Sequence, residues 1–395
     1  MKGRLLCGAI ALLLLLGAVG YYGFFVPTSE ALQRAESFEF RRMQVARVGD
    51  EARYRFFFAT NRAVEAGSAS LQEGLGATRG GALTLGSFDT RIEPSLGLGR
   101  WLDASTWFRD EEIKVLNLRP LERNAFAAEL RAMVAASPHR GLLLIVHGYR
   151  SSFDFALRGT AFLAHVLDIN APVMVFDWPG NQGGSLSGYR RAQQVATESS
   201  AELAETLRLI VREIQPERLW LVANSMGAQV AVDAFSELYR DSEFADAAVE
   251  IDEVVLTAPD VDRDRFNRQF RKELAALARN TTVYVSSNDR ALLASRIVNR
   301  ARRLGESTLS KEDAEMLDAA EGAFDLVEAG NDRVSLIDVT PVNRTRNFHN
   351  FSLEVPEYFD DIFLRLTNPE TPENRLRYQF RTPDGKIYSV LTRGR

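Results

Sequence analysis

The fold of this 395-residue chain is constrained most by a series of short apolar segments that alternate with amphipathic segments from about residue 113 onward. The apolar segments are 142–146, 173–176, 219–222, 254–256, 282–285 and 336–339. They lack polar alternation, so each is predicted to be a strand buried on both faces, as in a parallel sheet. The segments between them, such as 198–214 and 266–278, have helical periodicity. Repeated strand–helix units predict an α/β fold with a doubly wound, mostly parallel sheet.

Two strands are predicted before this region, at 54–60 and 82–88, and glycines indicate a loop between them. These glycines are Gly74, Gly76, Gly80 and Gly81. The predicted organisation is an N-terminal segment 1–27, a linker 28–52, a catalytic domain 53–365 with a charged helical insertion at about 300–333, and a C-terminal β-hairpin extension 366–395.

The first 27 residues are predicted to be a membrane anchor. Lys2 and Arg4 precede an uncharged run over 5–26, which as a helix would extend about 33 Å and span a bilayer. Because this run is longer than the apolar part of a secretory signal, we expect one uncleaved transmembrane helix, with a cleaved signal as the alternative. The basic residues before the run place the rest of the chain on the non-cytoplasmic side, which is the periplasm or cell envelope in a bacterium.

Composition excludes several classes of protein. The proportions of hydrophobic residues (46%) and charged residues (26%) are typical of a globular protein. Its net charge is −5 and its basic residues are scattered, so no nucleic-acid partner is predicted. Cys7 is the single cysteine, which rules out an internal disulfide. Neither a metal-ligand cluster nor a glycine-rich phosphate loop is visible, so we predict no metal and no cofactor.

A serine stands where the strand 219–222 passes into a helix, in Ala223-Asn224-Ser225-Met226-Gly227. A small residue on either side, a strand before and a helix after are typical of a nucleophile elbow. Ser225 is therefore the predicted nucleophile.

The strand 142–146 ends in His147-Gly148-Tyr149, the pattern expected beside an oxyanion hole. The amides of Tyr149 and Met226 are the predicted oxyanion donors. His147 and Gly148 are predicted to support this loop. Asp177 and Trp178 follow the strand 173–176 and are predicted to line or support the pocket.

The general base is predicted from chain order. A nucleophile elbow in a doubly wound α/β sheet is typical of the α/β-hydrolase fold. Proteins of this fold place the nucleophile first in the chain, then the acid, then the histidine. Of the four histidines, His349 alone follows the last core strand, whereas His139 and His165 precede the nucleophile.

The acid is expected just past a strand between Ser225 and His349. Asp289 follows the strand 282–285 and is the preferred choice, because it lies in the last strand-end loop before the one that holds the base. Asp260 and Asp262 follow the preceding strand and are the alternatives.

Several stretches together resemble a bacterial branch of α/β hydrolases long catalogued as a domain of unknown function and described as esterase- or lipase-like. The stretches are Phe58-Ala59-Thr60-Asn61-Arg62, His147-Gly148-Tyr149 with Phe155-Ala156-Leu157-Arg158, Phe176-Asp177-Trp178-Pro179, Asn224-Ser225-Met226-Gly227, Ala258-Pro259-Asp260-Val261-Asp262 and Tyr284 to Leu292. The similarity spans about residues 53 to 360 and implies Ser225, Asp289 and His349 as the triad. Asn224 and Gly180 stand where this branch usually has His and Ser.

The leading hypothesis is a serine hydrolase that cleaves a small-molecule or lipid carboxylic ester through an acyl-enzyme on Ser225. An acyltransferase or amidase that uses the same serine is one alternative. A non-catalytic envelope protein that binds ligands on a hydrolase scaffold is another, since fold alone does not set function.

Overall fold

The computed structural model describes most of the chain after residue 42. The described residues are 43–49, 53–65, 67–68, 70–92, 113–245, 251–306, 333–343, 345, 349, 351–367, 377–381 and 387–392. The predicted membrane segment 1–27, most of the predicted linker and residues 307–332 of the predicted insertion lie outside them. Within the described residues, no helix has the length and apolar character needed to cross a bilayer.

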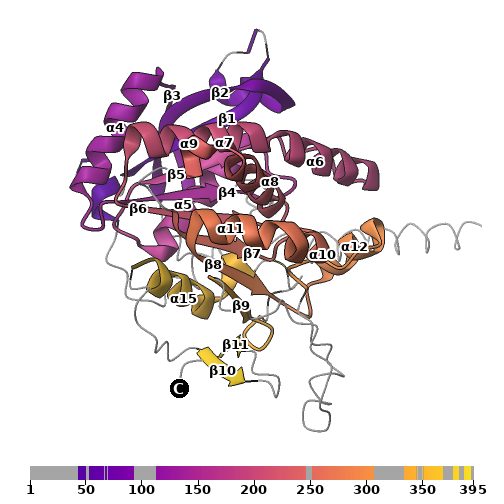
Figure 1. Cartoon of the computed structure of the whole chain (residues 1–395). Helices are drawn as coiled ribbons and strands as arrows, with labels where there is room; N and C mark the ends of the chain where they lie inside the picture. The colour runs from indigo at the N-terminus through magenta and orange to yellow at the C-terminus, as the bar shows by residue number, and fades with distance from the viewer. Residues whose placement is uncertain are drawn as a thin grey trace, which may run out of the picture.

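One sheet organises the described residues (Figure 1). Its eleven strands among these residues follow the order β10-β11-β9-β8-β7-β6-β4-β5-β1-β2-β3. The strands are β1 Arg53–Val64, β2 Leu75–Ile92, β3 Ile113–Pro120, β4 Gly141–Val146, β5 Val173–Asp177, β6 Arg218–Asn224, β7 Ile251–Thr257, β8 Ala278–Val285, β9 Val334–Asp338, β10 Arg377–Arg381 and β11 Ile387–Leu391. Pairing is parallel from β1 through β5, β4, β6, β7 and β8 to β9 and on to β11. Antiparallel pairs stand at both ends, β1–β2–β3 and β10–β11.

Helices cover both faces of the sheet, which explains the uninterrupted apolar strands. In β4, Leu142 and Leu144 pack into the core on one face, while Leu143 and Ile145 pack into the core on the other. Successive strand residues point to opposite faces, so a strand covered on both sides needs apolar residues at every position.

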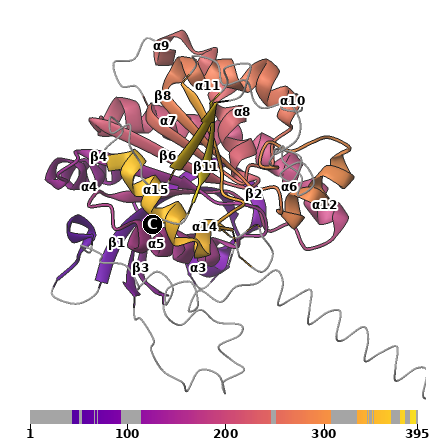
Figure 2. The ribbon, with the colours of Figure 1, turned by 90° about the horizontal axis from the view of Figure 1, so that it is seen from below.

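The first face is covered by helices that lie between residues 123 and 277. These are α4 Arg123–Ala136, α6 Leu186–Glu198, α7 Ser200–Leu209 with the π-helical turn η4 Ile210–Ile214, α8 Gly227–Tyr239, and α11 Arg271–Leu277 with the π-helical turn η5 Phe266–Phe270. The second face is covered by α5 Phe153–Leu167 and α15 Pro356–Thr367, which Figure 2 shows over the sheet. The remaining helices are α12 Arg290–Asn299 and the short η1 Gln44–Ala46, α3 Leu71–Gly74, α9 Ser242–Ala245, α10 Arg263–Arg265 and α14 Phe351–Glu354.

The prediction that Gly74, Gly76, Gly80 and Gly81 form a loop between the first two strands is wrong. Gly76, Gly80 and Gly81 lie inside β2, and the short helix α3 lies between β1 and β2 instead. A side chain at Gly80 would meet the backbone of Ala63 at 3.1 Å. Gly80 therefore permits close approach of two strands around an irregular register, and Gly81 supplies a left-handed φ of +74° within β2 rather than a turn between strands.

The C-terminal strands join the main sheet. β10 and β11 pair with each other, and β11 also pairs in parallel with β9 through Ser389 and Val390. The turn signal at 382–386 that predicted this hairpin lies outside the described residues.

Candidate active site

The carboxyl ends of the parallel strands lie together at one edge of the sheet, where ligands bind in open α/β sheets. Ser225 stands at this edge, between the end of β6 and the start of α8. His349 follows β9 in the chain, and Asp289 follows β8.

Ser225 occupies a sharp strand-to-helix turn. Its φ is +52°, in the left-handed region that costs energy for a residue other than glycine. Three backbone hydrogen bonds hold it there: its N–H donates to the Thr257 carbonyl at 2.9 Å, and its carbonyl accepts from Ala228 at 3.1 Å and Asp260 at 3.0 Å. The backbone is therefore fixed without help from the side chain, which leaves the hydroxyl available for other contacts.

Two glycines allow the turn to press against the end of β4. A side chain at Gly227 would meet the His147 carbonyl oxygen at 2.3 Å and the Val146 carbonyl oxygen at 2.7 Å. A side chain at Gly148 would stand 3.1 Å from the Ser225 Cβ. The turn at Ser225 and the loop after β4 are therefore packed backbone to backbone.

His349 bridges Ser225 and Asp289. Its Nε2 lies 3.0 Å from Ser225 Oγ, and its Nδ1 lies 2.6 Å from Asp289 Oδ2. The other carboxylate oxygen of Asp289 accepts hydrogen bonds from the amides of Ala291 and Leu292, both at 3.0 Å, and so caps α12. With both oxygens occupied, the carboxylate is fixed in orientation toward the imidazole.

The surroundings of His349 favour its protonated form. Burial acts to lower its pKa, but the charge and hydrogen bond of Asp289, together with the charge of Asp260, outweigh burial and leave the pKa above its ordinary value. The side chain of His349 is 16% exposed and that of Asp289 is fully buried. The group can therefore exchange protons with a ligand while its partner stays shielded from water.

The two alternative acids are engaged elsewhere. Asp260 accepts from Tyr189 Oη, Ser295 Oγ and Arg303 Nε, each at 2.6 Å. Asp262 caps α10 by accepting from the amide of Arg265 at 2.7 Å. Of the three acidic residues considered, Asp289 is the one hydrogen-bonded to His349.

The two amides predicted as oxyanion donors come from different loops, the Met226 amide from the residue after Ser225 and the Tyr149 amide from the loop after β4. Met226 precedes the first residue of α8, where helix amides lack intrahelical acceptors. Tyr149 follows Gly148, the residue that approaches the Ser225 Cβ. Within the described part of the chain, neither the Tyr149 nor the Met226 N–H has a hydrogen-bond acceptor. Both amides are thus available to an incoming oxygen.

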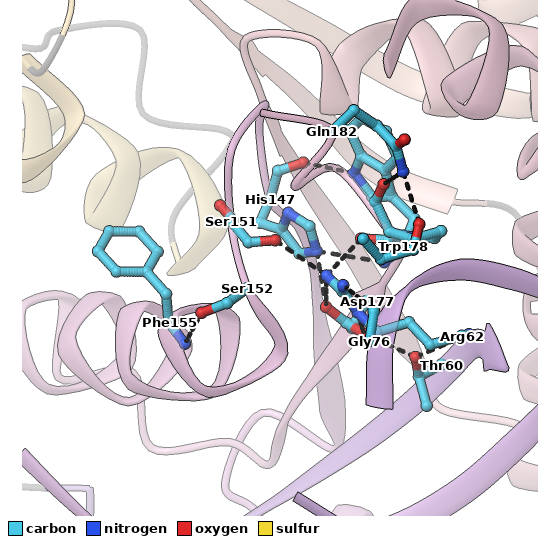
Figure 3. A network of polar contacts seen from close by, with 12 residues as sticks. Thr60, Arg62, Gly76, His147, Ser151, Ser152, Phe155, Asp177, Trp178 and Gln182 are labelled. Atoms are coloured by element: carbon cyan, nitrogen blue, oxygen red, sulfur yellow. Dashed lines mark hydrogen bonds and ion pairs between the residues drawn. The ribbon is translucent and has the colours of Figure 1, made fainter. Parts of the chain in front are cut away.

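His147, Asp177 and Trp178 form a buried support beneath the loop after β4 (Figure 3). His147 Nε2 lies 2.9 Å from Asp177 Oδ1, and its Nδ1 lies 2.9 Å from the Gly148 carbonyl oxygen. Trp178 stacks on the His147 ring, with ring centroids 5.7 Å apart, and its Nε1–H donates to the His147 carbonyl. None of these contacts reaches Ser225 Oγ, so the structure places the three residues behind the loop.

Two residues of this support were not predicted as site residues, Thr60 and Arg62. Thr60 Oγ1 donates to Asp177 Oδ2 at 2.6 Å, and Arg62 Nε donates to the same oxygen at 2.7 Å. Both belong to the Phe58–Arg62 stretch that carried part of the family resemblance. That stretch was the sequence feature that could have pointed to these two residues. In the structure β1 pairs with β5, which places Thr60 opposite Asp177.

The other two histidines lie away from this constellation. His139 contacts Trp220, with ring centroids 6.0 Å apart, and His165 lies in α5 beside Tyr54. No group of three or more His, Cys, Asp or Glu side chains able to hold a metal ion is found among the described residues.

Comparison with known proteins points to one family. Residues 122–354 match the family described as "Alpha/beta hydrolase of unknown function (DUF900)". No protein in a search of curated sequences matches the chain.

Three solved structures are similar at low sequence identity. A candidate cell surface hydrolase from Lactobacillus plantarum WCFS1 is 12% identical, with 58% of this chain and 94% of that chain covered and a TM-score of 0.33. A lipase-esterase related protein from Clostridium acetobutylicum ATCC 824 is 13% identical over 41% of this chain and 82% of that chain, with a TM-score of 0.23. A candidate hydrolase from Agrobacterium vitis S4 is 14% identical over 70% of this chain and 96% of that chain, with a TM-score of 0.27.

Proposed function

The chain belongs to the α/β-hydrolase family of unknown function that its sequence matches over residues 122–354, and from that premise we propose that it hydrolyses carboxylic esters through an acyl-enzyme on Ser225. Membership confirms the resemblance and the predicted α/β-hydrolase fold with its mostly parallel sheet. The observation that carries the proposal is the continuous hydrogen-bonded path from Asp289 through His349 to Ser225 Oγ.

The proposed reaction begins with attack of Ser225 Oγ on the ester carbonyl carbon. His349 Nε2 takes the hydroxyl proton as the new C–O bond forms. The amides of Tyr149 and Met226 donate to the carbonyl oxygen as it becomes an oxyanion. When the tetrahedral intermediate collapses, the alkoxide leaves with the proton from His349 Nε2. Water then repeats these steps on the acyl-enzyme, releasing the acid and restoring Ser225.

The proposal is tested by reaction with a fluorophosphonate probe, which labels an activated serine without knowledge of the natural substrate. We expect the wild-type protein to be labelled at Ser225, located by mass spectrometry of peptides. Heat-denatured protein should not react, because the serine depends on His349 for activation. A folded protein that stays unlabelled would favour a binding protein on a hydrolase scaffold, and labelling at another serine would refute the assignment of Ser225.

We also expect the acidic limb of the pH–rate profile to reflect the protonation of His349. Below the folded pKa of His349, the imidazole carries a proton and cannot accept that of Ser225, so activity falls as pH falls. Because the net effect of burial, Asp289 and Asp260 raises this pKa, the midpoint of kcat/KM should lie above the ordinary histidine value of about 6.5. Thermal melts over the same pH range would separate this loss from unfolding. A midpoint at or below the ordinary value would contradict the role of His349.

A further inference from the structure

We propose that Arg62 is a positioning residue that holds the loop Gly148–Ser152 in place, so that the Tyr149 amide faces the carbonyl oxygen of the ester that Ser225 attacks. The inference deepens the proposed ester hydrolysis and rests on it. Arg62 lies at the end of β1, far from Ser225 in the chain, and makes none of the contacts of a catalytic residue.

Arg62 connects three strand ends through its guanidinium group (Figure 3). Nη1 donates to the Gly76 carbonyl in β2 at 2.6 Å. Nη2 lies 2.9 Å from the Ser151 carbonyl oxygen, after β4, and 2.8 Å from the Trp178 carbonyl oxygen, after β5. One planar group thus fixes the distance between the predicted oxyanion loop and the neighbouring strand-end loop.

Asp177 fixes the guanidinium itself. Its two carboxylate oxygens accept from Arg62 Nε at 2.7 Å and Nη2 at 3.0 Å, and both side chains are almost fully buried. Burial acts to raise the pKa of Asp177, but Arg62 and His147 outweigh it and lower the pKa to about 2. The carboxylate therefore stays charged at neutral pH, and the bidentate geometry leaves the guanidinium one orientation.

The loop has little freedom to absorb a change at Arg62. The Arg150 amide donates to the Gly180 carbonyl at 3.0 Å, and the positive φ of Arg150, +67°, marks a tight turn right after Tyr149. On the other side, Gly148 packs against the Ser225 Cβ. A shift of Ser151 is therefore transmitted to Tyr149, which lies between these two contacts.

The inference is tested with Arg62→Lys in the full chain. Lysine keeps the positive charge for Asp177, but it lacks the planar fork whose three nitrogens hold both oxygens of Asp177, the Gly76 carbonyl and the strand-end carbonyls together. Since a misplacement of about 1 Å can cost about 10²-fold in rate, we expect kcat for p-nitrophenyl acetate to fall about 10- to 100-fold with KM changed less than about threefold. The inhibition constant of phenylboronic acid, which forms a tetrahedral adduct on serine, should rise by a similar factor.

Arg377→Lys provides the matched control. Arg377 also forms a bidentate pair, with the buried Asp361 at 2.5 and 2.7 Å, and among the described residues these hydrogen bonds join β10 to α15 rather than to the site. This variant should lose thermal stability while its kcat and boronate inhibition stay at wild-type values. Equal kinetic losses in both lysine variants would mean that Arg62 acts only through stability, and would overturn the inference.

A double variant, Arg62→Met with Asp177→Asn, covers the case in which Arg62→Lys does not fold. Replacing both members of a buried pair by neutral residues leaves no unpaired charge and is often tolerated. We expect it to fold and to show the same loss of kcat and weaker boronate inhibition. Wild-type kinetics in this variant would overturn the inference and leave the proposed function intact. A folded wild-type protein without esterase activity would overturn both the proposed function and the inference.

Discussion

Replacing Ser225 by alanine is expected to lower kcat for ester hydrolysis by roughly 10⁶, the loss seen when the nucleophile of a serine protease is removed. In the proposed mechanism the hydroxyl bonds to the substrate carbon, so its removal leaves His349 without a proton to take. Fluorophosphonate labelling should disappear with it. The fold should survive, because the contacts that hold the turn use the Ser225 backbone N–H and carbonyl and not Oγ.

Ser137→Ala is the control for this loss. Ser137 is also buried, and its Oγ donates to the Asn170 carbonyl at 2.9 Å, but it follows α4 and precedes β4, at the opposite end of the strands. We expect wild-type kcat from this variant. The role of Ser225 is tested by measuring kcat and thermal melts for both variants. A folded Ser225→Ala protein that retains more than about one hundredth of the wild-type kcat would show that Ser225 is not the nucleophile.

Asp289→Asn should reduce kcat by up to about 10⁴ while leaving thermal stability nearly unchanged. Asparagine caps a helix about as well as aspartate, so one side-chain oxygen can still accept from Ala291 and Leu292. Its amide N–H₂ would then face His349 Nδ1 and donate to it, which forces the tautomer with the proton on Nε2. In that tautomer Nε2 cannot accept the Ser225 proton.

Two other aspartates serve as controls for Asp289→Asn. Asp262→Asn changes the cap of α10 and should leave kcat near the wild-type value. Asp260→Asn weakens the buried pair with Arg303 and should lower the melting temperature more than Asp289→Asn does. Steady-state kinetics and melts on all three would contradict the assignment if kcat collapsed in Asp260→Asn or Asp262→Asn but not in Asp289→Asn.

The parts of the structure that could be predicted from the sequence are those encoded locally or by chain order. The buried strands are continuous apolar runs, because both faces of the sheet are covered. Ser225 lies in a local strand–turn–helix pattern, and His349 and Asp289 were ranked by their order after it. Chain order gave the preference for Asp289 over Asp260, but the partner of Asp260 needed the structure, where Arg303, 43 residues further along the chain, binds that carboxylate.

The parts that could not be predicted depend on contacts between distant residues. Arg62 and Asp177 are 115 residues apart, and although each lies in a stretch of the family resemblance, no pattern around either residue indicates that the two side chains pair. The strand β3, Ile113–Pro120, was not anticipated because it mixes buried, half-buried and exposed positions without a regular period. The glycines of β2 were misjudged because closely packed antiparallel strands and loops both use glycine.

The separation of the proposed triad along the chain bears on when during synthesis the protein can become active. Ser225 and His349 are 124 residues apart, and β7, β8 and β9 lie between them. The N-terminal part of a chain leaves the ribosome first, so the serine emerges long before its base. A nascent chain working through this triad stays inert until residue 349 has been added and β9 has paired with β8. Any product that ends between the two residues, through early termination or proteolytic clipping, is therefore expected to be catalytically silent, even where its sheet has formed.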